Sequence, residues 1–158
     1  VVPRERRLLA ALGPRKLELA RDRFGGAVTL LADADSTRWT RERLGPTATL
    51  AVDQLLVLDE DPQAARAAAR GVVGFLAQVG GYAAAFARMG FDEAAIREVS
   101  DELIDATVVW GDEDRVLDRI RHQEAAGADH VVLGPLPTPG APDGLAVVER
   151  LAERLECV

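Results

Sequence analysis

Short apolar runs alternate along the chain with longer segments in which apolar positions recur at helical spacing. The runs at residues 8–12, 27–32, 49–58 and 128–133 are typical of buried strands, and the stretch 106–111 is typical of either a strand or a buried loop. Helices are predicted over residues 63–79, 82–89 and 113–126 and from 143 to about 155. Further helices are predicted to begin at residue 14, at 92 and at 100 or 101, and another to end at about residue 44. This alternation predicts an α/β fold in which right-handed βαβ units form a parallel sheet.

Four such units correspond to half of a TIM (β/α)₈ barrel, which leaves two sheet edges unpaired and one side of the inner layer uncovered. The 158 residues are expected to form a single domain over residues 1–158. The sequence starts at Val1 without an initiator methionine, which indicates a trimmed start or a piece of a longer protein.

The first strand, the turn after it and the following helix form the first candidate site. The apolar run stops at Gly13, and Pro14 suits the first helical position, where its missing N–H costs nothing. Glycine lets a ligand approach the backbone, and the free N–H groups of the helix's first turn favour an anion. An ordinary strand-to-helix turn is the alternative. Arg15 is expected either to reach a phosphate here or to be a solvated helix residue.

Polar residues in or beside the strands are the other candidates. Asp53 and Gln54 interrupt an apolar strand, so one of them needs a hydrogen-bond partner if it is buried. An inward-facing polar residue here either lines a pocket or has a structural partner. Asp129 and His130 stand at the start of the last strand, an end of the barrel where residues serve stability rather than catalysis. His122 lies mid-helix among polar residues and is expected to be exposed.

Composition narrows the classes of partner and compartment. The formal net charge of −7 argues against a nucleic-acid-binding surface, and no apolar run reaches membrane-spanning length. The single cysteine, Cys157, excludes an internal disulfide and a cysteine zinc site, and favours a reducing, cytoplasmic compartment. A helix N-terminus accounts for the acids Asp59, Glu60 and Asp61, so no metal site is expected.

Three stretches occur in an order shared with one known family. They are Leu-Ala-Ala-Leu-Gly-Pro-Arg at 9–15 with a following Gly-Gly pair, residues 67–91, and residues 103–133. Together they resemble the carboxyl-terminal half of the bacterial luciferase-like monooxygenase superfamily, and within it the coenzyme F420-dependent oxidoreductases. The resemblance implies a TIM barrel of which this chain would supply strands five to eight and their helices.

The resemblance also implies a cofactor site at the first turn. In that family, the turn equivalent to Ala10, Ala11, Leu12 and Gly13 meets the phosphate end of FMN or coenzyme F420, and Arg15 stands just beyond it. The family's catalytic side chains and its deazaflavin cradle lie largely in the first four strands, which this sequence does not contain. No catalytic residue is therefore assigned.

The sequence departs from the family pattern at four places. Lys16 stands where relatives usually have an apolar residue, and residues 27–32 lack a His-Pro-Tyr-like stretch. Gly80-Gly81 replaces a Leu-Pro-Asn-like stretch, and Gly134-Pro135 follows the last strand, where a glutamine is frequent. These differences leave the substrate open.

Two functional hypotheses follow. In the first, the chain supplies the cofactor-phosphate end of an oxidoreductase that moves hydride between coenzyme F420 and a small organic substrate, or of a monooxygenase that uses reduced flavin and oxygen. In the second, it is a truncated, non-catalytic half-barrel that self-associates or pairs with another chain. The expected partners are a small-molecule substrate and a second half-barrel, from this chain or another, with neither nucleic acid nor membrane.

Overall fold

The computed structural model describes residues 2–139 and 144–155, and its centre is a parallel sheet. The strands of the described chain are β1 (Leu8–Ala10), β2 (Gly26–Leu30), β3 (Thr49–Val57), β4 (Val109–Trp110) and β5 (His130–Pro135). β1 pairs with β2, β2 with β3, and β3 with β5, so four strands lie side by side in chain order. The two-residue β4 pairs only with Leu56 and Val57 at the end of β3. The predicted α/β fold with a parallel sheet is confirmed.

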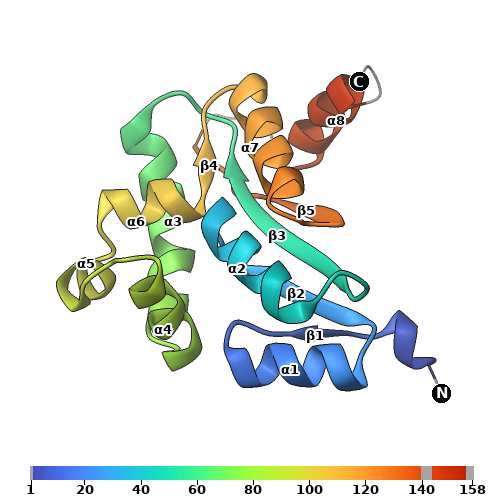
Figure 1. Ribbon diagram of the computed structural model, residues 1–158. Helices are drawn as coiled ribbons and strands as arrows, with labels where there is room; N and C mark the ends of the chain where they lie inside the picture. Colours follow the sequence, from blue (N-terminus) through green and yellow to red (C-terminus); the bar gives the residue numbers. More distant parts are fainter. Residues whose placement is uncertain (1, 140–143, 156–158) are drawn as a thin grey trace.

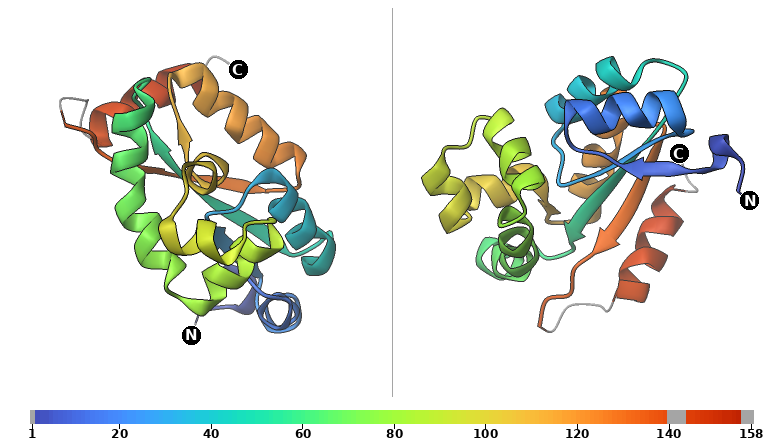
Figure 2. Two further views of the ribbon diagram at one scale, coloured as in Figure 1. Left: turned by 90° about the vertical axis from the view of Figure 1, so that its left-hand side faces the viewer. Right: turned by 90° about the horizontal axis from the view of Figure 1, so that it is seen from below.

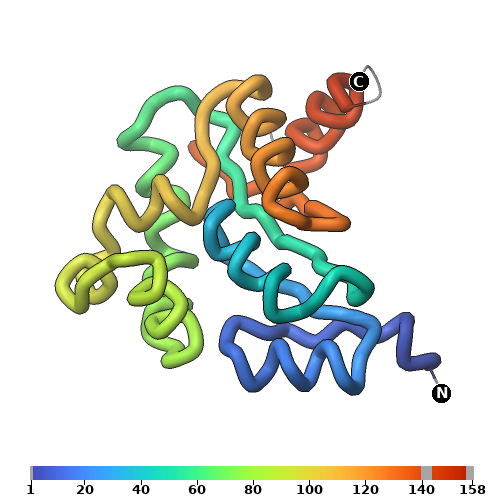
Figure 3. The backbone as a smooth tube through the Cα atoms, in the orientation of Figure 1, coloured from blue at the N-terminus to red at the C-terminus, as the bar shows by residue number. Residues whose placement is uncertain are grey.

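Helices alternate with these strands (Figure 1). They are the 3₁₀ turn Arg4–Arg6, α1 (Pro14–Arg23), α2 (Ala34–Leu44), α3 (Pro62–Ala77), α4 (Gly80–Arg88), α5 (Glu93–Glu98), α6 (Asp101–Thr107), α7 (Glu113–Ala125) and α8 (Gly144–Leu155). The tube in Figure 3 runs from the β1–α1 pair at one end of the molecule to α8 at the other. Among the described residues, no helix has the length and apolar character that a membrane span requires.

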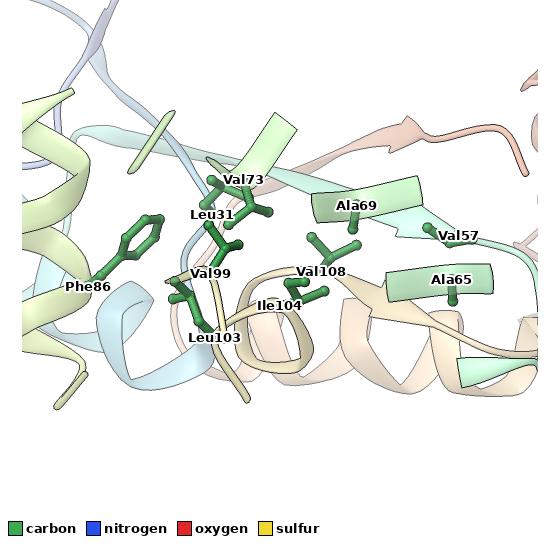
Figure 4. Close-up of a cluster of buried hydrophobic side chains, with 10 residues drawn as sticks. All are labelled: Leu31, Val57, Ala65, Ala69, Val73, Phe86, Val99, Leu103, Ile104 and Val108. Carbon is green, nitrogen blue, oxygen red and sulfur yellow. The ribbon is translucent and has the colours of Figure 1, made fainter. Parts of the chain in front are cut away.

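One face of the sheet is covered by α1, α2, α7 and α8. Leu17 of α1 and Leu44 of α2 pack on Leu50 of β3, and helices α7 and α8 pack on Leu56 and on strand β5. Helices α3–α6 instead form a separate group on the other side of the strands (Figure 2). Their apolar side chains point toward one another around Phe86 and Leu103, as the close-up in Figure 4 shows.

Side-chain caps fix the starts of several helices. Asp112 accepts a hydrogen bond from the N–H of Arg115, and Asp33, Asp92 and Ser100 cap α2, α5 and α6 in the same way. The predicted starts at Asp92, Ser100 and Asp112 are therefore confirmed. For α8, the predicted start at Asp143 lies outside the described residues, as does Cys157.

Three predicted boundaries were wrong. β1 ends at Ala10 rather than at residue 12, although the Ala11 N–H still donates to Val28. The break predicted between residues 79 and 82 lies at Gln78 and Val79 instead, because the Gly80-Gly81 pair forms the first turn of α4. β5 spans His130–Pro135 rather than 128–133; Leu136, not Pro135, donates to Leu56, so the missing N–H of the proline leaves no gap.

Candidate functional site

A cavity of about 660 Å³ lies at the carboxyl ends of β1–β3, on the sheet face opposite α1 and α2. Its lining includes all five residues predicted for a cofactor, Ala10, Ala11, Leu12, Gly13 and Arg15. Val28 and Leu30 of β2 and Asp53 of β3 continue the wall, and Tyr82 and Arg88 of α4 close it from the other side. The structure thus brings the predicted residues together around one cavity.

Gly13 borders this cavity as the N-cap of α1. Its φ of −119° is an extended conformation open to any residue, so the backbone of the turn does not itself require glycine. A Cβ built on Gly13 would meet nothing within 4 Å, so the space above it is open. Because glycine has no capping side chain and Pro14 no N–H, the first-turn N–H groups of Arg15 and Lys16 remain available to an anion.

Cationic side chains surround this helix end. Arg15 and Lys16 line the cavity from the first turn of α1, and Arg88 lines it from the end of α4. The Arg88 guanidinium donates to the carbonyl oxygen of Leu12 and lies 4.6 Å from the centre of the Trp39 ring. Partial burial, and then the like charge of Arg43, lower the pKa of Arg88. This corner of the cavity suits a phosphate or carboxylate.

Arg88 is a site residue that sequence reasoning missed, as is Tyr82 on the same helix. Arg88 belongs to one of the stretches shared with the family, but no spacing in the sequence connects it to Leu12, 76 positions earlier. The helices α3 and α4 bring it to the turn, and their arrangement depends on packing around Phe86.

Asp53 lies at the other side of the cavity, and Tyr82 is close enough to interact with it. Burial raises the pKa of the half-buried Asp53 carboxyl. Burial, and then the negative charge of Asp53, raise the pKa of Tyr82. The Asp53 carboxyl gives this side an acidic character, and Tyr82 contributes a neutral hydroxyl.

A second cavity, of about 400 Å³, adjoins the first. The two share Leu12, Thr29, Leu30 and Arg88, and the second extends toward Trp39 and the start of α2. The hydroxyl of Thr29 is buried and has no hydrogen-bond partner within the described part of the chain.

The remaining candidate residues lie away from these cavities. Asp129 accepts hydrogen bonds from the N–H of Leu50 and from Arg41, which confirms a structural role. His130 is exposed at the first position of β5, at the opposite end from the cavity, and His122 is exposed on α7 as expected. Within residues 2–139 and 144–155, no group of three or more His, Cys, Asp or Glu side chains is placed to hold a metal ion.

Comparisons with known proteins identify the family and the fold. The family described as luciferase-like monooxygenase matches residues 2–130, whereas no curated protein matches the chain. The coenzyme F420-dependent tetrahydromethanopterin reductase from Methanopyrus kandleri is 23% identical with a TM-score of 0.67; the match covers 89% of this chain and 47% of that one. An F420-dependent secondary alcohol dehydrogenase, solved with an F420-acetone adduct, is 16% identical with a TM-score of 0.57. This match covers 80% of this chain and 42% of the dehydrogenase.

These likenesses define the fold and its extent. The chain spans less than half the length of either solved structure, and its four side-by-side strands correspond to about half of the TIM-barrel fold of these proteins. The match over residues 2–130 covers most of the chain. The chain belongs to the luciferase-like monooxygenase family.

Proposed function

We propose that the 660 Å³ cavity binds the phosphate end of coenzyme F420, with FMN as the alternative, through the start of α1. The chain would thereby contribute to an oxidoreductase that moves hydride between the cofactor and a small organic substrate. The observation that supports this most directly is the uncapped N-terminus of α1, which opens onto a cavity bordered by Arg15, Lys16 and Arg88.

Each element has a role in holding such a ligand. The N–H groups of Arg15 and Lys16 point along the helix axis toward a bound phosphate, and the partial positive charge of the helix end adds to the attraction. The hydrogen bond from Arg88 to Leu12 holds its guanidinium near the same position. Beyond this corner, the small and apolar side chains of Ala10, Val28 and Leu30 offer contact to a flat or extended ligand.

The solved relatives support the choice of cofactor. Both are named as F420-dependent enzymes, although at 16% and 23% identity they establish the fold alone. When bound, a deazaflavin or flavin supplies the hydride chemistry, while the described residues bind and orient its phosphate end. Since the chain spans less than half of these proteins, complete turnover would require a second half-barrel.

A titration of the purified chain with oxidised coenzyme F420 and, separately, with FMN tests this proposal. Binding followed by fluorescence is expected to weaken about tenfold or more in Gly13→Val, because the new side chain occupies space that the ligand needs. The backbone at position 13 accepts valine without strain, so the variant is expected to fold.

Gly71→Val is the matched control. Gly71 lies on α3 away from the cavity, and a Cβ there also meets nothing within 4 Å. Unchanged affinity in Gly13→Val would refute the phosphate position. If neither cofactor binds the wild-type chain, the non-catalytic half-barrel becomes the better description.

A further inference from the structure

Asp53 is an unpaired carboxylate within the cavity wall. It occupies β3, on the sheet face that carries Leu30 and Leu55, and is half-buried. Within the described chain it makes no hydrogen bond and no ion pair, and Tyr82 of α4 is the titratable group that interacts with it. Half-buried carboxylates without a partner are uncommon because the loss of hydration is not compensated.

The neighbouring residue Gln54 shows what a structural polar residue looks like in this strand. Its side chain is buried on the opposite face, where it donates to the carbonyl oxygen of Thr107 and accepts from Gln123. The fold therefore satisfies Gln54 from within the chain and leaves the adjacent Asp53 oxygens free.

Gly134 of β5 keeps the space beside Asp53 clear. A Cβ at position 134 would come within 2.8 Å of Leu55 Cδ2 and 3.4 Å of Asp53 Oδ1. A side chain at position 134 would therefore displace the tip of Leu55 and lie in van der Waals contact with Asp53. The carboxylate consequently has an open side, bordered by Gly134 on β5 and Tyr82 on α4.

We propose that Asp53 and Tyr82, beside Gly134, form a subsite that binds an N–H or O–H donor group of the organic substrate. A free carboxylate can only accept hydrogen bonds, so it selects ammonium and hydroxyl groups and disfavours a second anion. The proposal rests on the proposed function in identifying the ligand as that substrate.

The sheet geometry separates this subsite from the phosphate position. Asp53 pairs with Leu30 of β2, and β2 pairs with β1, so Asp53 lies two strands from the turn that precedes α1. Two strand spacings amount to about 10 Å. The cavity therefore has a cationic corner at Arg15, Lys16 and Arg88 and an acidic side at Asp53. A cofactor phosphate and a donor-bearing substrate can occupy these positions together.

The test uses three small probes of one shape, benzylamine, benzyl alcohol and benzoate, titrated by ligand-observed NMR without any cofactor. The expected order of affinity is benzylamine, then benzyl alcohol, then benzoate. Asp53→Asn is expected to weaken benzylamine about tenfold, since a charge-assisted hydrogen bond is lost, and to affect benzyl alcohol less. Asp22→Asn, at an exposed position of α1, is the matched control and should leave all three unchanged.

A second readout follows the carboxyl carbon of Asp53 by ¹³C NMR. In the free chain, burial is expected to hold the pKa of the Asp53 carboxyl above its ordinary value. When benzylamine binds, this pKa is expected to fall, because a nearby cation favours the ionised form. A merely structural aspartate would show no such ligand-dependent change.

Equal binding of all three probes, or an Asp53→Asn variant that binds benzylamine as the wild type does, would overturn the proposal. Because no cofactor is present, these outcomes are independent of whether coenzyme F420 or FMN binds at α1. Loss of cofactor binding with retained benzylamine selectivity would thus reject the proposed function alone.

Discussion

Gln123 of α7 joins three elements through hydrogen bonds in a buried position. It accepts from the hydroxyl of Thr37 at 2.7 Å and donates to the carbonyl oxygen of Ala32 at 2.8 Å and to Gln54 at 3.0 Å. All of these groups are shielded from water, so each depends on the others for its hydrogen bonds. The amide fixes α2 and α7 against β3.

Gln123→Leu is expected to lower the free energy of unfolding by about 1–3 kcal/mol, because the Oε1 atom of Gln54 and the hydroxyl of Thr37 each lose a buried hydrogen-bond partner. Urea unfolding followed by circular dichroism measures the change. Gln78→Leu is the matched control, since Gln78 is exposed and makes one weak side-chain bond. The explanation would be wrong if both variants lost the same stability.

Residues 53 and 54 also show what the sequence could and could not predict. Adjacent residues of a strand face opposite sides of the sheet, so only one of these two side chains can face the cavity. Which one meets the cavity depends on where α4 and α7 lie, and those positions come from packing between distant segments. For the same reason Arg88 could not be connected to the turn.

At the level of elements, Asp105 of α6 connects this helix to α3 and β4 through hydrogen bonds. It accepts two hydrogen bonds from Arg66, at 3.0 and 2.6 Å, and one from the Trp110 indole at 2.7 Å. Burial alone would raise the pKa of Asp105, but the bonds from Arg66 and Trp110 outweigh it and the pKa is lowered. The ionised carboxylate is therefore the form that the fold stabilises.

This lowered pKa predicts a pH dependence. An aspartate with a folded-state pKa below its unfolded value of about 3.9 stabilises the protein above that pH, and the contribution is lost as the pH falls through the folded value. Asp105→Asn is expected to have a lower urea midpoint than the wild type at pH 7, with a smaller difference at pH 3. Asp118→Asn removes an exposed ion pair with Arg121 and should have the same urea midpoint as the wild type at both pH values. A pH-independent difference would show that the charge is not responsible.

Local signals explain which elements were predictable. Capping residues and Pro14 indicated where helices begin, and apolar runs located the ends of the four main strands to within two residues. Errors occurred where tertiary contacts override the local pattern, as in β5, whose first and last residues follow its pairing with β3. The turn that borders the 660 Å³ cavity was predicted as a site from local signals and a family resemblance, while the wall that α4 contributes was not predicted.

For the whole molecule, the open question is what lies against the uncovered edges of the sheet. Within the described chain, β1 and β5 each pair with one neighbour, and Leu8 and Val132 are 40% and 48% exposed on the face away from α1 and α8. Unpaired edges next to apolar residues favour association with a second half-barrel. Two copies related by a twofold axis would pair β1 of each with β5 of the other and close an eight-stranded barrel.

This arrangement predicts that the chain self-associates. Light scattering coupled to size-exclusion chromatography is expected to give a mass above the 16.9 kDa of one chain, and Val132→Lys is expected to shift it to the monomer, because a charge on β5 opposes edge pairing. Phe75→Lys is the control: it removes the most exposed large apolar side chain of the described residues, on α3 and away from both edges, and should leave the mass unchanged. A monomeric wild type would instead require the complementary half-barrel to come from elsewhere, whereas dissociation by Phe75→Lys alone would place the contact on α3.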